Sequence, residues 1–181
     1  MSFGSFDIDL LKAIDVDRIT ALDPIFQFLS NTAPYICGLI PIGFILFGIF
    51  RKSRSVRLLG YKIASSYLLS VIISNLLKIV IDRPRPFATY PFIQKLSAGG
   101  GTSFPSGHTS DVFAIATAMS ILFPKRMVII PFYIWATCVA YSRMDLGVHY
   151  PTDVLGGAAV GAISALICIK LFNLKSKDRA L

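Results

Sequence analysis

Long apolar segments, separated by short polar connections, make up most of this chain. A transmembrane helix needs about 20 apolar residues. Four segments approach that length, and they cover residues 31–50, 58–81, 127–142 and 152–172. A fifth segment, 108–123, is long enough only if its helix includes the polar residues at its start. The pattern predicts an all-α fold: a polytopic membrane helix bundle with five to six transmembrane helices.

The first 30 residues are too polar to cross a bilayer. Apolar residues alternate there with aspartates, a broken amphipathic pattern that is typical of helices lying in the membrane interface. Asp23-Pro24 is typical of a helix start, and Ser30 or Asn31 is a candidate cap for the first spanning helix. We expect one membrane-embedded domain over 1–181 and no cleavable signal peptide. Its predicted parts are interfacial helices over 1–30, a transmembrane bundle over 31–172 and a cytoplasmic tail over 173–181.

The composition supports a membrane protein. Apolar residues make up 54% of the chain and charged residues only 15%, against about 25% charged residues in soluble domains. The alternative is a soluble helical bundle, which would need polar outer faces that 31–50 lacks. Cys37, Cys138 and Cys168 fall in apolar segments without metal-ligand spacing. We therefore expect buried thiols, and neither a disulfide nor a zinc site.

The charge distribution predicts an orientation. If five segments alternate, one side carries 11 basic residues and one aspartate, and the other carries seven basic residues and nine aspartates. Because basic residues accumulate on the cytoplasmic side, 51–57, 124–126 and the C-terminal tail should be cytoplasmic. The N-terminus and the polar loops 82–107 and 143–151 should lie outside. Topology then accounts for the net charge of +8, and nucleic-acid binding is not needed to explain it.

The segment from Ser142 to Asp153 is the most unusual part of the pattern, because it places charged residues between two apolar segments. Pro151 suits the first turn of a helix. If that turn reaches back to His149, a spacing of four brings His149 and Asp153 onto one face. A carboxylate beside an imidazole prepares a histidine to act as a nucleophile or a base.

A second polar group ends the segment 58–81. Ser66, Ser70, Ser74 and Lys78 recur every four residues. We expect the serines to serve helix packing, whereas Lys78 either extends to the headgroups or binds a phosphate inside the bundle. The prolines of Asp82-Arg-Pro-Arg-Pro end that helix. The loop that follows, 87–104, is a candidate flexible cover for a site.

A third polar group, from Thr102 to Thr109, precedes the segment 108–123. Ser106 or Ser103 is a candidate helix cap, and Gly107 permits close approach of the backbone to a ligand. Free backbone N–H groups at a helix N-terminus favour anions, so His108 is a functional candidate there. Asp111 either pairs with His108 or a nearby cation, or only completes the charge pattern at the helix start.

These groups together suit a phosphate ligand. Lysine and arginine bind phosphate oxygens, and two histidines allow one to attack phosphorus while the other protonates the leaving oxygen. No group of hard oxygen ligands accompanies them, so no metal or other cofactor is implied. The candidate site residues are Lys78, Arg85, Ser106, Gly107, His108, Arg143, His149 and Asp153.

The chain resembles the type 2 phosphatidic acid phosphatase superfamily of integral membrane lipid phosphatases. Three family motifs occur in order: Lys, six residues, Arg-Pro; Pro-Ser-Gly-His; and Ser-Arg, five residues, His, three residues, Asp. They run from Lys78 to Arg85-Pro86, from Pro105 to His108, and from Ser142 to Asp153. The residues before 78 match only loosely.

The resemblance implies a mechanism. His149 would form a phosphohistidine with Asp153 orienting it, and His108 would be the general acid. Lys78, Arg85, Ser106, Gly107 and Arg143 would bind the phosphoryl oxygens and stabilise the transition state. Water would hydrolyse the intermediate without a metal.

We therefore expect a lipid phosphatase of the inner (cytoplasmic) membrane whose site faces the exterior or periplasm. Its partners would be membrane lipids and a lipid phosphate whose tail enters between helices, with no obligate protein partner implied. Candidate substrates are undecaprenyl diphosphate, phosphatidylglycerophosphate, phosphatidic acid or its pyrophosphate, and the phosphates of lipid A. The small size of the protein slightly favours undecaprenyl diphosphate, whose headgroup is only phosphate. The alternatives are a small transporter or channel with a basic anion site, and a soluble haloperoxidase or acid phosphatase with the same motifs.

Overall fold

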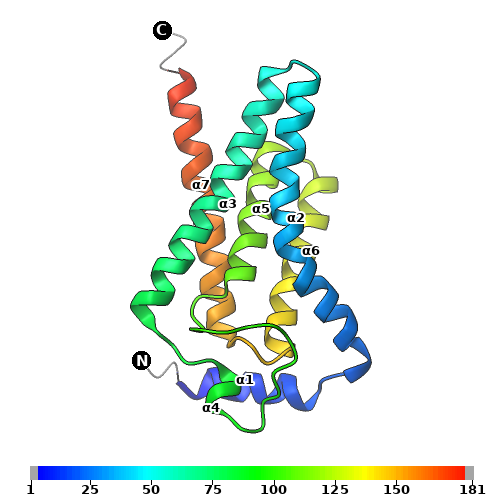
Figure 1. The fold of residues 1–181 in the computed structure, drawn as a ribbon, viewed down its shortest axis with the longest axis vertical. Coiled ribbons are helices and arrows are strands. Elements are labelled where there is room, and N and C mark those ends of the chain that lie inside the picture. Colours follow the sequence, from blue (N-terminus) through cyan, green and yellow to red (C-terminus); the bar gives the residue numbers. More distant parts are fainter. Residues whose placement is uncertain (1–3, 178–181) are drawn as a thin grey trace.

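The computed structural model describes residues 4–177, and every regular element in that range is a helix (Figure 1). In chain order the elements are α1 (Gly4–Val16), a short 3-10 helix η1 (Thr20–Leu22), α2 (Asp23–Phe50), α3 (Arg54–Ile81), α4 (Pro86–Thr89), α5 (Gly107–Leu122), α6 (Arg126–Asp145) and α7 (Pro151–Lys177).

The outer surface of the bundle is apolar. Four stretches of the described chain, containing α2, α3, α6 and α7, are long and apolar enough to cross a bilayer. Large apolar side chains on them, including Phe50, Ile79, Val80 and Met127, are at least 78% exposed. Such a surface suits a lipid environment and not water. The prediction of an all-α membrane helix bundle is confirmed, and a soluble bundle is excluded.

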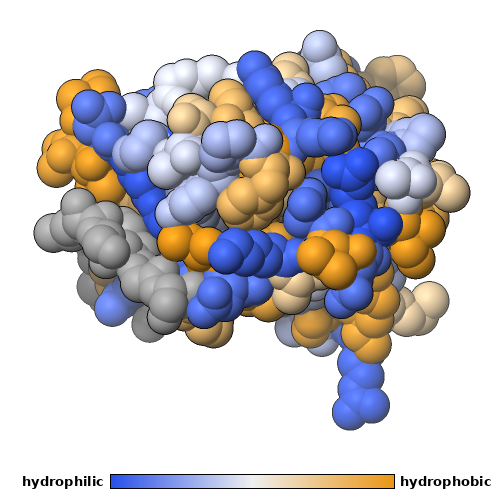
Figure 2. All heavy atoms as spheres, turned by 90° about the horizontal axis from the view of Figure 1, so that it is seen from below, coloured by the Kyte–Doolittle hydropathy of each residue, from blue (hydrophilic) through white to orange (hydrophobic). Residues whose placement is uncertain are grey.

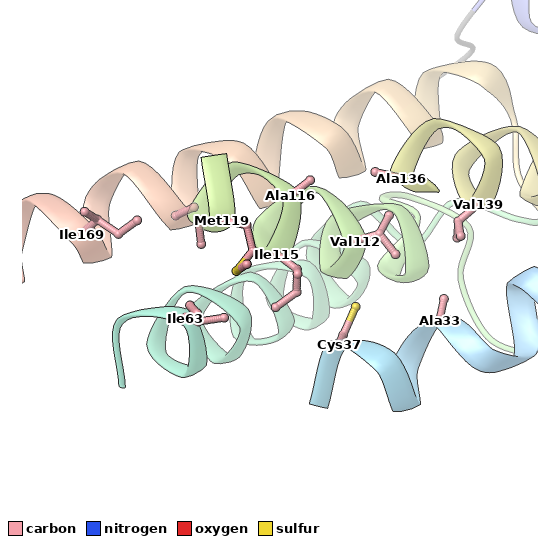
Figure 3. Packing of buried hydrophobic residues seen from close by; sticks show 12 residues of the cluster. Ala33, Cys37, Ile63, Val112, Ile115, Ala116, Met119, Ala136, Val139 and Ile169 are labelled. Atoms are coloured by element: carbon pink, nitrogen blue, oxygen red, sulfur yellow. The ribbon is translucent and has the colours of Figure 1, made fainter. Parts of the chain in front are cut away.

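Helix α5 lies at the centre of the bundle, where it contacts α2, α3, α6 and α7. Figure 3 shows Val112 and Ile115 of α5 among Cys37 of α2, Ile63 of α3 and Val139 of α6, all of them fully buried. At 16 residues α5 is about 24 Å long, shorter than the hydrocarbon layer. Because its neighbours surround it, its faces contact protein rather than lipid.

Glycines on α7 allow the close approach of α5. A Cβ atom added at Gly157 would lie 2.5 Å from the carbonyl oxygen of Ser106 and 3.1 Å from Cβ of Thr109. Gly161, one turn further along, faces the carbonyl oxygen of Ser110 in the same way. The small residues of α7 therefore serve helix packing, as is common between membrane helices.

The first long helix begins at one of the two starts that the sequence predicts. Helix α2 starts at Asp23, with Pro24 in its first turn, which confirms the helix start at Asp23-Pro24. The helix runs on through residue 31, so the separate start at residue 31 and the cap at Ser30 or Asn31 are wrong. Ser30 lies inside the helix, and its hydroxyl accepts a hydrogen bond from Nη1 of Arg143. The physical reason is that a helix does not have to end where its sequence becomes polar, because polar residues on one face can contact other parts of the protein.

Helix α1 lies across one end of the bundle (Figure 1). One of its faces packs against the rest of the protein: Asp7 and Leu11 are buried, whereas Phe6 and Val16 are exposed. The polar loops 82–106 and 146–150 lie at this same end, and the connection between α2 and α3 lies at the other (Figure 1). The predicted grouping of both polar loops on one side is therefore confirmed.

Candidate active site

The three polar groups of the sequence meet at the end of the bundle that α1 crosses. Here the C-terminal ends of α3 and α6 meet the N-terminal ends of α5 and α7 (Figure 1). Viewed from this end, polar side chains cover much of the surface, with apolar ones both between them and toward its edge (Figure 2). Residues more than 60 positions apart in sequence are in contact in this region.

His149 and Asp153 form a buried pair, with side chains 2% and 0% exposed. Nδ1 of His149 lies 3.5 Å from Oδ2 of Asp153. The spacing prediction is thus confirmed, although His149 lies in the turn before α7 and not in the helix itself. Oδ2 of Asp153 also accepts hydrogen bonds from Oγ of Ser103 at 2.5 Å and from the backbone N–H of Tyr150 at 2.9 Å.

The His149 ring is neutral at physiological pH. Burial lowers its pKa to about 4, and the hydrogen bond with Asp153 only partly opposes that shift. Because a carboxylate accepts and does not donate, it favours the tautomer with the proton on Nδ1. That tautomer leaves the lone pair of Nε2 free for attack on an electrophile.

The N-terminus of α5 supplies the second imidazole. Ser106 occupies the cap position with an extended backbone, but its hydroxyl accepts from Oγ1 of Thr109 at 2.9 Å and does not cap a backbone N–H. A Cβ atom added at Gly107 would meet nothing within 4 Å, so space lies beside the backbone there. His108, in the first turn, lies within electrostatic range of His149 and of the site's cations.

Lys78 points into the bundle and does not extend toward the headgroups. Its Nζ donates to the carbonyl oxygen of Pro105 at 2.7 Å and to that of Thr102 at 3.2 Å. Lys78 therefore joins the end of α3 to the segment that precedes α5. The position that the second alternative requires is thus observed, and the binding of phosphate by Lys78 stays a prediction.

The two arginines hold the loop between α4 and α5. Arg85 donates to the carbonyl oxygens of Gly100 at 2.9 Å, Gly101 at 3.2 Å and Val148 at 3.2 Å. Arg143 donates to Ser97 and to the carbonyl oxygen of Ala98, at 3.1 and 3.4 Å. Within the range that the structure describes, Nε of Arg143 is buried without a hydrogen-bond partner.

Lys78, Arg85 and Arg143 share one electrostatic property. Among residues 4–177 none of the three forms an ion pair with a carboxylate; their recorded acceptors are carbonyl and hydroxyl oxygens. Since no carboxylate of the described residues lies within ion-pair distance of them, an anion that enters meets three cations and a helix N-terminus.

Sequence reasoning missed two residues of this region, Arg83 and Asp7. Arg83 donates to Asp153 and to Asp7, at 2.7 Å in both cases. The sequence offered one signal for Arg83, which is its place in Asp82-Arg-Pro-Arg-Pro beside Arg85. It offered none for Asp7, which lies in a different element and far from Asp153 along the chain.

The expected role of Asp111 is wrong in both of its forms. Its Oδ1 accepts a hydrogen bond from Oγ of Ser70 on α3, at 3.4 Å, and not from His108 or a cation. It therefore takes part in the contact between α3 and α5, as does Ser110, which accepts from Ser74 at 2.9 Å. The prediction that the serines of α3 serve helix packing is confirmed for these two. Nowhere in the described range do three or more His, Cys, Asp or Glu side chains gather as a candidate metal site.

This end of the bundle thus brings together a buried imidazole, a carboxylate beside it and three cations that have no carboxylate partner among residues 4–177, a set of groups that suits a phosphate ligand. Residues 59–177 match the sequence model of the PAP2 superfamily. The chain belongs to that superfamily, as the motifs of the sequence predicted.

Named relatives agree with this assignment. The chain is 30% identical over 155 residues to the undecaprenyl-diphosphatase BcrC of Bacillus subtilis, covering 86% of this chain and 77% of the relative. It is 30% identical over 171 residues to an undecaprenyl-diphosphatase of Sulfolobus acidocaldarius, covering 92% and 78%. The structure is also similar to the crystal structure of a transmembrane PAP2 type phosphatidylglycerolphosphate phosphatase from Bacillus subtilis. The TM-score is 0.77, with 27% identity, over 94% of this chain and 86% of the other. This chain is accordingly a membrane lipid phosphatase of the PAP2 family.

Proposed function

We propose that this protein hydrolyses a lipid phosphate or diphosphate through a phosphohistidine on His149, without a metal ion. The observation that carries the proposal is the buried pair of His149 and Asp153, which lies at the same end of the bundle as three cations that have no carboxylate partner among the residues described.

In the first step, the Nε2 lone pair of His149 forms a bond to phosphorus while the bond from phosphorus to the leaving oxygen breaks. His108 gives its proton to that oxygen. Burial, and then the nearby cations, disfavour the protonated form of His108. The negative charge of a bound phosphate opposes both effects and so favours the protonated form that a general acid needs. Asp153 stabilises the positive charge that develops on the His149 ring.

In the second step, water attacks the phosphohistidine. The new oxygen–phosphorus bond forms as the nitrogen–phosphorus bond breaks, and His108, now neutral, accepts a proton from the water. Inorganic phosphate leaves, and His149 regains its lone pair. Lys78, Arg85 and Arg143, with the backbone at Ser106 and Gly107, would bind the three phosphoryl oxygens and stabilise the charge of the transition state. These contacts supply the charge neutralisation that a metal ion supplies in other phosphatases.

We infer that the site faces the outside of the inner (cytoplasmic) membrane. The end opposite the site carries Arg51, Lys52, Arg54 and Arg57, and basic residues accumulate on the cytoplasmic side. A protease-accessible tag at the C-terminus should therefore be cleaved only after cells are opened. Cleavage of the tag in intact cells would show that the site faces the cytoplasm.

Undecaprenyl diphosphate is the substrate that we favour. Two relatives that span most of the chain are named for that activity, and the small size of this chain suits a headgroup made only of phosphate. Phosphatidylglycerophosphate is the second candidate, because the structural neighbour is named for it.

Phosphate release by purified, detergent-solubilised protein tests the proposal. Undecaprenyl diphosphate, phosphatidylglycerophosphate and phosphatidic acid are compared by kcat/KM, with His149→Gln as the inactive control. We expect turnover in the presence of excess chelator and the highest kcat/KM for the diphosphate. A folded protein that releases phosphate from none of the three would favour the transporter alternative, and activity that chelator abolishes would refute the metal-free mechanism.

A further inference from the structure

We propose that Asp7, on helix α1, is a positioning residue for the candidate catalytic pair and acts through Arg83. The proposal rests on the proposed function of His149 and Asp153. It adds a residue from outside the three motifs, on an element that contributes no group to the phosphate site.

Arg83 links Asp7 to Asp153. Its Nη1 donates to Oδ1 of Asp153 at 2.7 Å, and its Nη2 donates to Oδ2 of Asp7 at 2.7 Å. The guanidinium carbon also lies 3.8 Å from the centre of the Tyr150 ring. Because a guanidinium is planar and its donors have fixed directions, a carboxylate on each nitrogen sets the orientation of the whole group.

Asp7 also fixes the start of α7. Its Oδ1 accepts from the backbone N–H of Thr152 at 3.0 Å, and its Oδ2 accepts from Oγ1 of Thr152 at 2.5 Å. The first N–H groups of a helix have no partner within the helix, and a carboxylate is favoured at this positive end. Asp7 therefore holds the residue that immediately precedes Asp153.

As a result, both carboxylate oxygens of Asp153 accept hydrogen bonds within the protein. Oδ1 of Asp153 accepts from Arg83, and Oδ2 accepts from Ser103 and from the backbone of Tyr150. These bonds keep Oδ2 beside Nδ1 of His149. The Asp7 side chain is 1% exposed and that of Arg83 is 9% exposed, so water does not readily replace either partner.

A purely structural role would give a different result. If Asp7 only anchored α1, its loss would lower stability and the active fraction, but the enzyme that stayed folded would turn over normally. If Asp7 positions Asp153, the folded enzyme itself turns over more slowly. Substrate affinity then changes little, because the phosphate-binding cations contact neither Asp7 nor Arg83 in the bonds described above.

The test compares Asp7→Asn with Asp9→Asn in the full-length protein. Asn keeps the size of the side chain and an acceptor for Thr152, but it removes the charge that Arg83 contacts. Asp9 lies on the same helix and is exposed, so its variant is the matched control for loss of one negative charge. A short-chain isoprenoid diphosphate in detergent is the substrate, and thermal unfolding reports the folded fraction. We expect kcat of Asp7→Asn to fall about tenfold or more, with KM within about threefold and Asp9→Asn unchanged.

Arg83→Lys provides a second, independent variant. It keeps the positive charge, but a lysine cannot reach both carboxylates with fixed geometry, so we expect the same loss of kcat. Because both residues act on Asp153 through one chain of contacts, the double variant should be no worse than the slower single variant. If Asp7→Asn does not fold, Arg83→Lys tests the proposal by the same measurement, a fall in kcat with KM nearly unchanged.

Normal kcat in folded Asp7→Asn would overturn the proposal, as would equal losses of kcat in Asp7→Asn and Asp9→Asn. Turnover by His149→Gln tests the proposed function separately from the role of Asp7. If His149→Gln retains turnover, the assignment of the nucleophile is wrong. If His149→Gln is inactive while Asp7→Asn turns over normally, only the positioning role is wrong.

Discussion

Gly157→Ala should disrupt the site through the packing of α7 against α5. The added Cβ would lie 2.5 Å from the carbonyl oxygen of Ser106, whereas an ordinary carbon–oxygen contact is about 3.3 Å or longer. The two helix starts must therefore move apart by about 0.8 Å. Overpacking of this kind costs about 1–3 kcal/mol.

The same displacement should reduce activity more than stability alone would. Ser106 lies one residue before Gly107 and two before His108, whereas Gly157 lies one helical turn after Asp153. The shift therefore moves the proposed acid relative to the proposed nucleophile, and a misplacement of about 1 Å can cost about 100-fold in rate. We expect Gly157→Ala to lower kcat between about 10-fold and 100-fold in the protein that remains folded.

Gly38→Ala is the matched control. Gly38 lies in α2, and a Cβ added there meets nothing within 4 Å. Alanine is better in a helix interior than glycine by about 1 kcal/mol, so this variant should melt at the same temperature as wild type or higher, with normal activity. Thermal unfolding in detergent and phosphate release measure both variants. The packing argument is refuted if Gly157→Ala melts and turns over like Gly38→Ala.

Two further predictions concern charge. His149 should remain neutral to well below pH 6, because burial lowers its pKa to about 4 from the usual value of about 6.5. The titration can be followed by NMR of ¹⁵N-labelled histidine, with a His108→Gln variant to assign the two signals. A titration midpoint of His149 above pH 6 would contradict this prediction. Since unfolded His149 binds its proton near pH 6.5 and the folded form only near pH 4, acidification through that window should also destabilise the fold. Arg143→Lys should lower kcat/KM about 10-fold to 100-fold although the charge is kept, because lysine lacks the planar fork whose Nη1 contacts Ser97 and whose Nη2 contacts the carbonyl oxygen of Ala98. A change of less than twofold would show that charge alone suffices.

Much of the fold and of the candidate site could be predicted from the sequence because the signals were local. Apolar runs predicted the long helices, and prolines marked where α3 ends and where α7 begins. The spacing from His149 to Asp153 predicted their contact, since four residues span about one helical turn. Alternation of helices then predicted that both polar loops would lie at one end.

Contacts between distant residues could not be read in this way. Helix α2 continues past the predicted boundary at Ser30. The Ser30 hydroxyl accepts a hydrogen bond from Arg143 only because α2 and α6 pack together. Asp7 contacts Thr152 and Arg83 because α1 folds across the end of the bundle. Asp111 faces Ser70 because of how α5 is rotated against α3, which the pattern of a nearly all-buried helix does not reveal.

The central claim is that His149 becomes phosphorylated during turnover. The chain contains only two histidines, so a labelled phosphohistidine can be assigned without ambiguity. Protein mixed briefly with a ³²P-labelled lipid diphosphate and quenched in base should carry an acid-labile label on the peptide with His149. The label should be absent in His149→Gln and present in His108→Gln when the leaving group is good. Label on the peptide with His108, or label that persists in His149→Gln, would contradict the account.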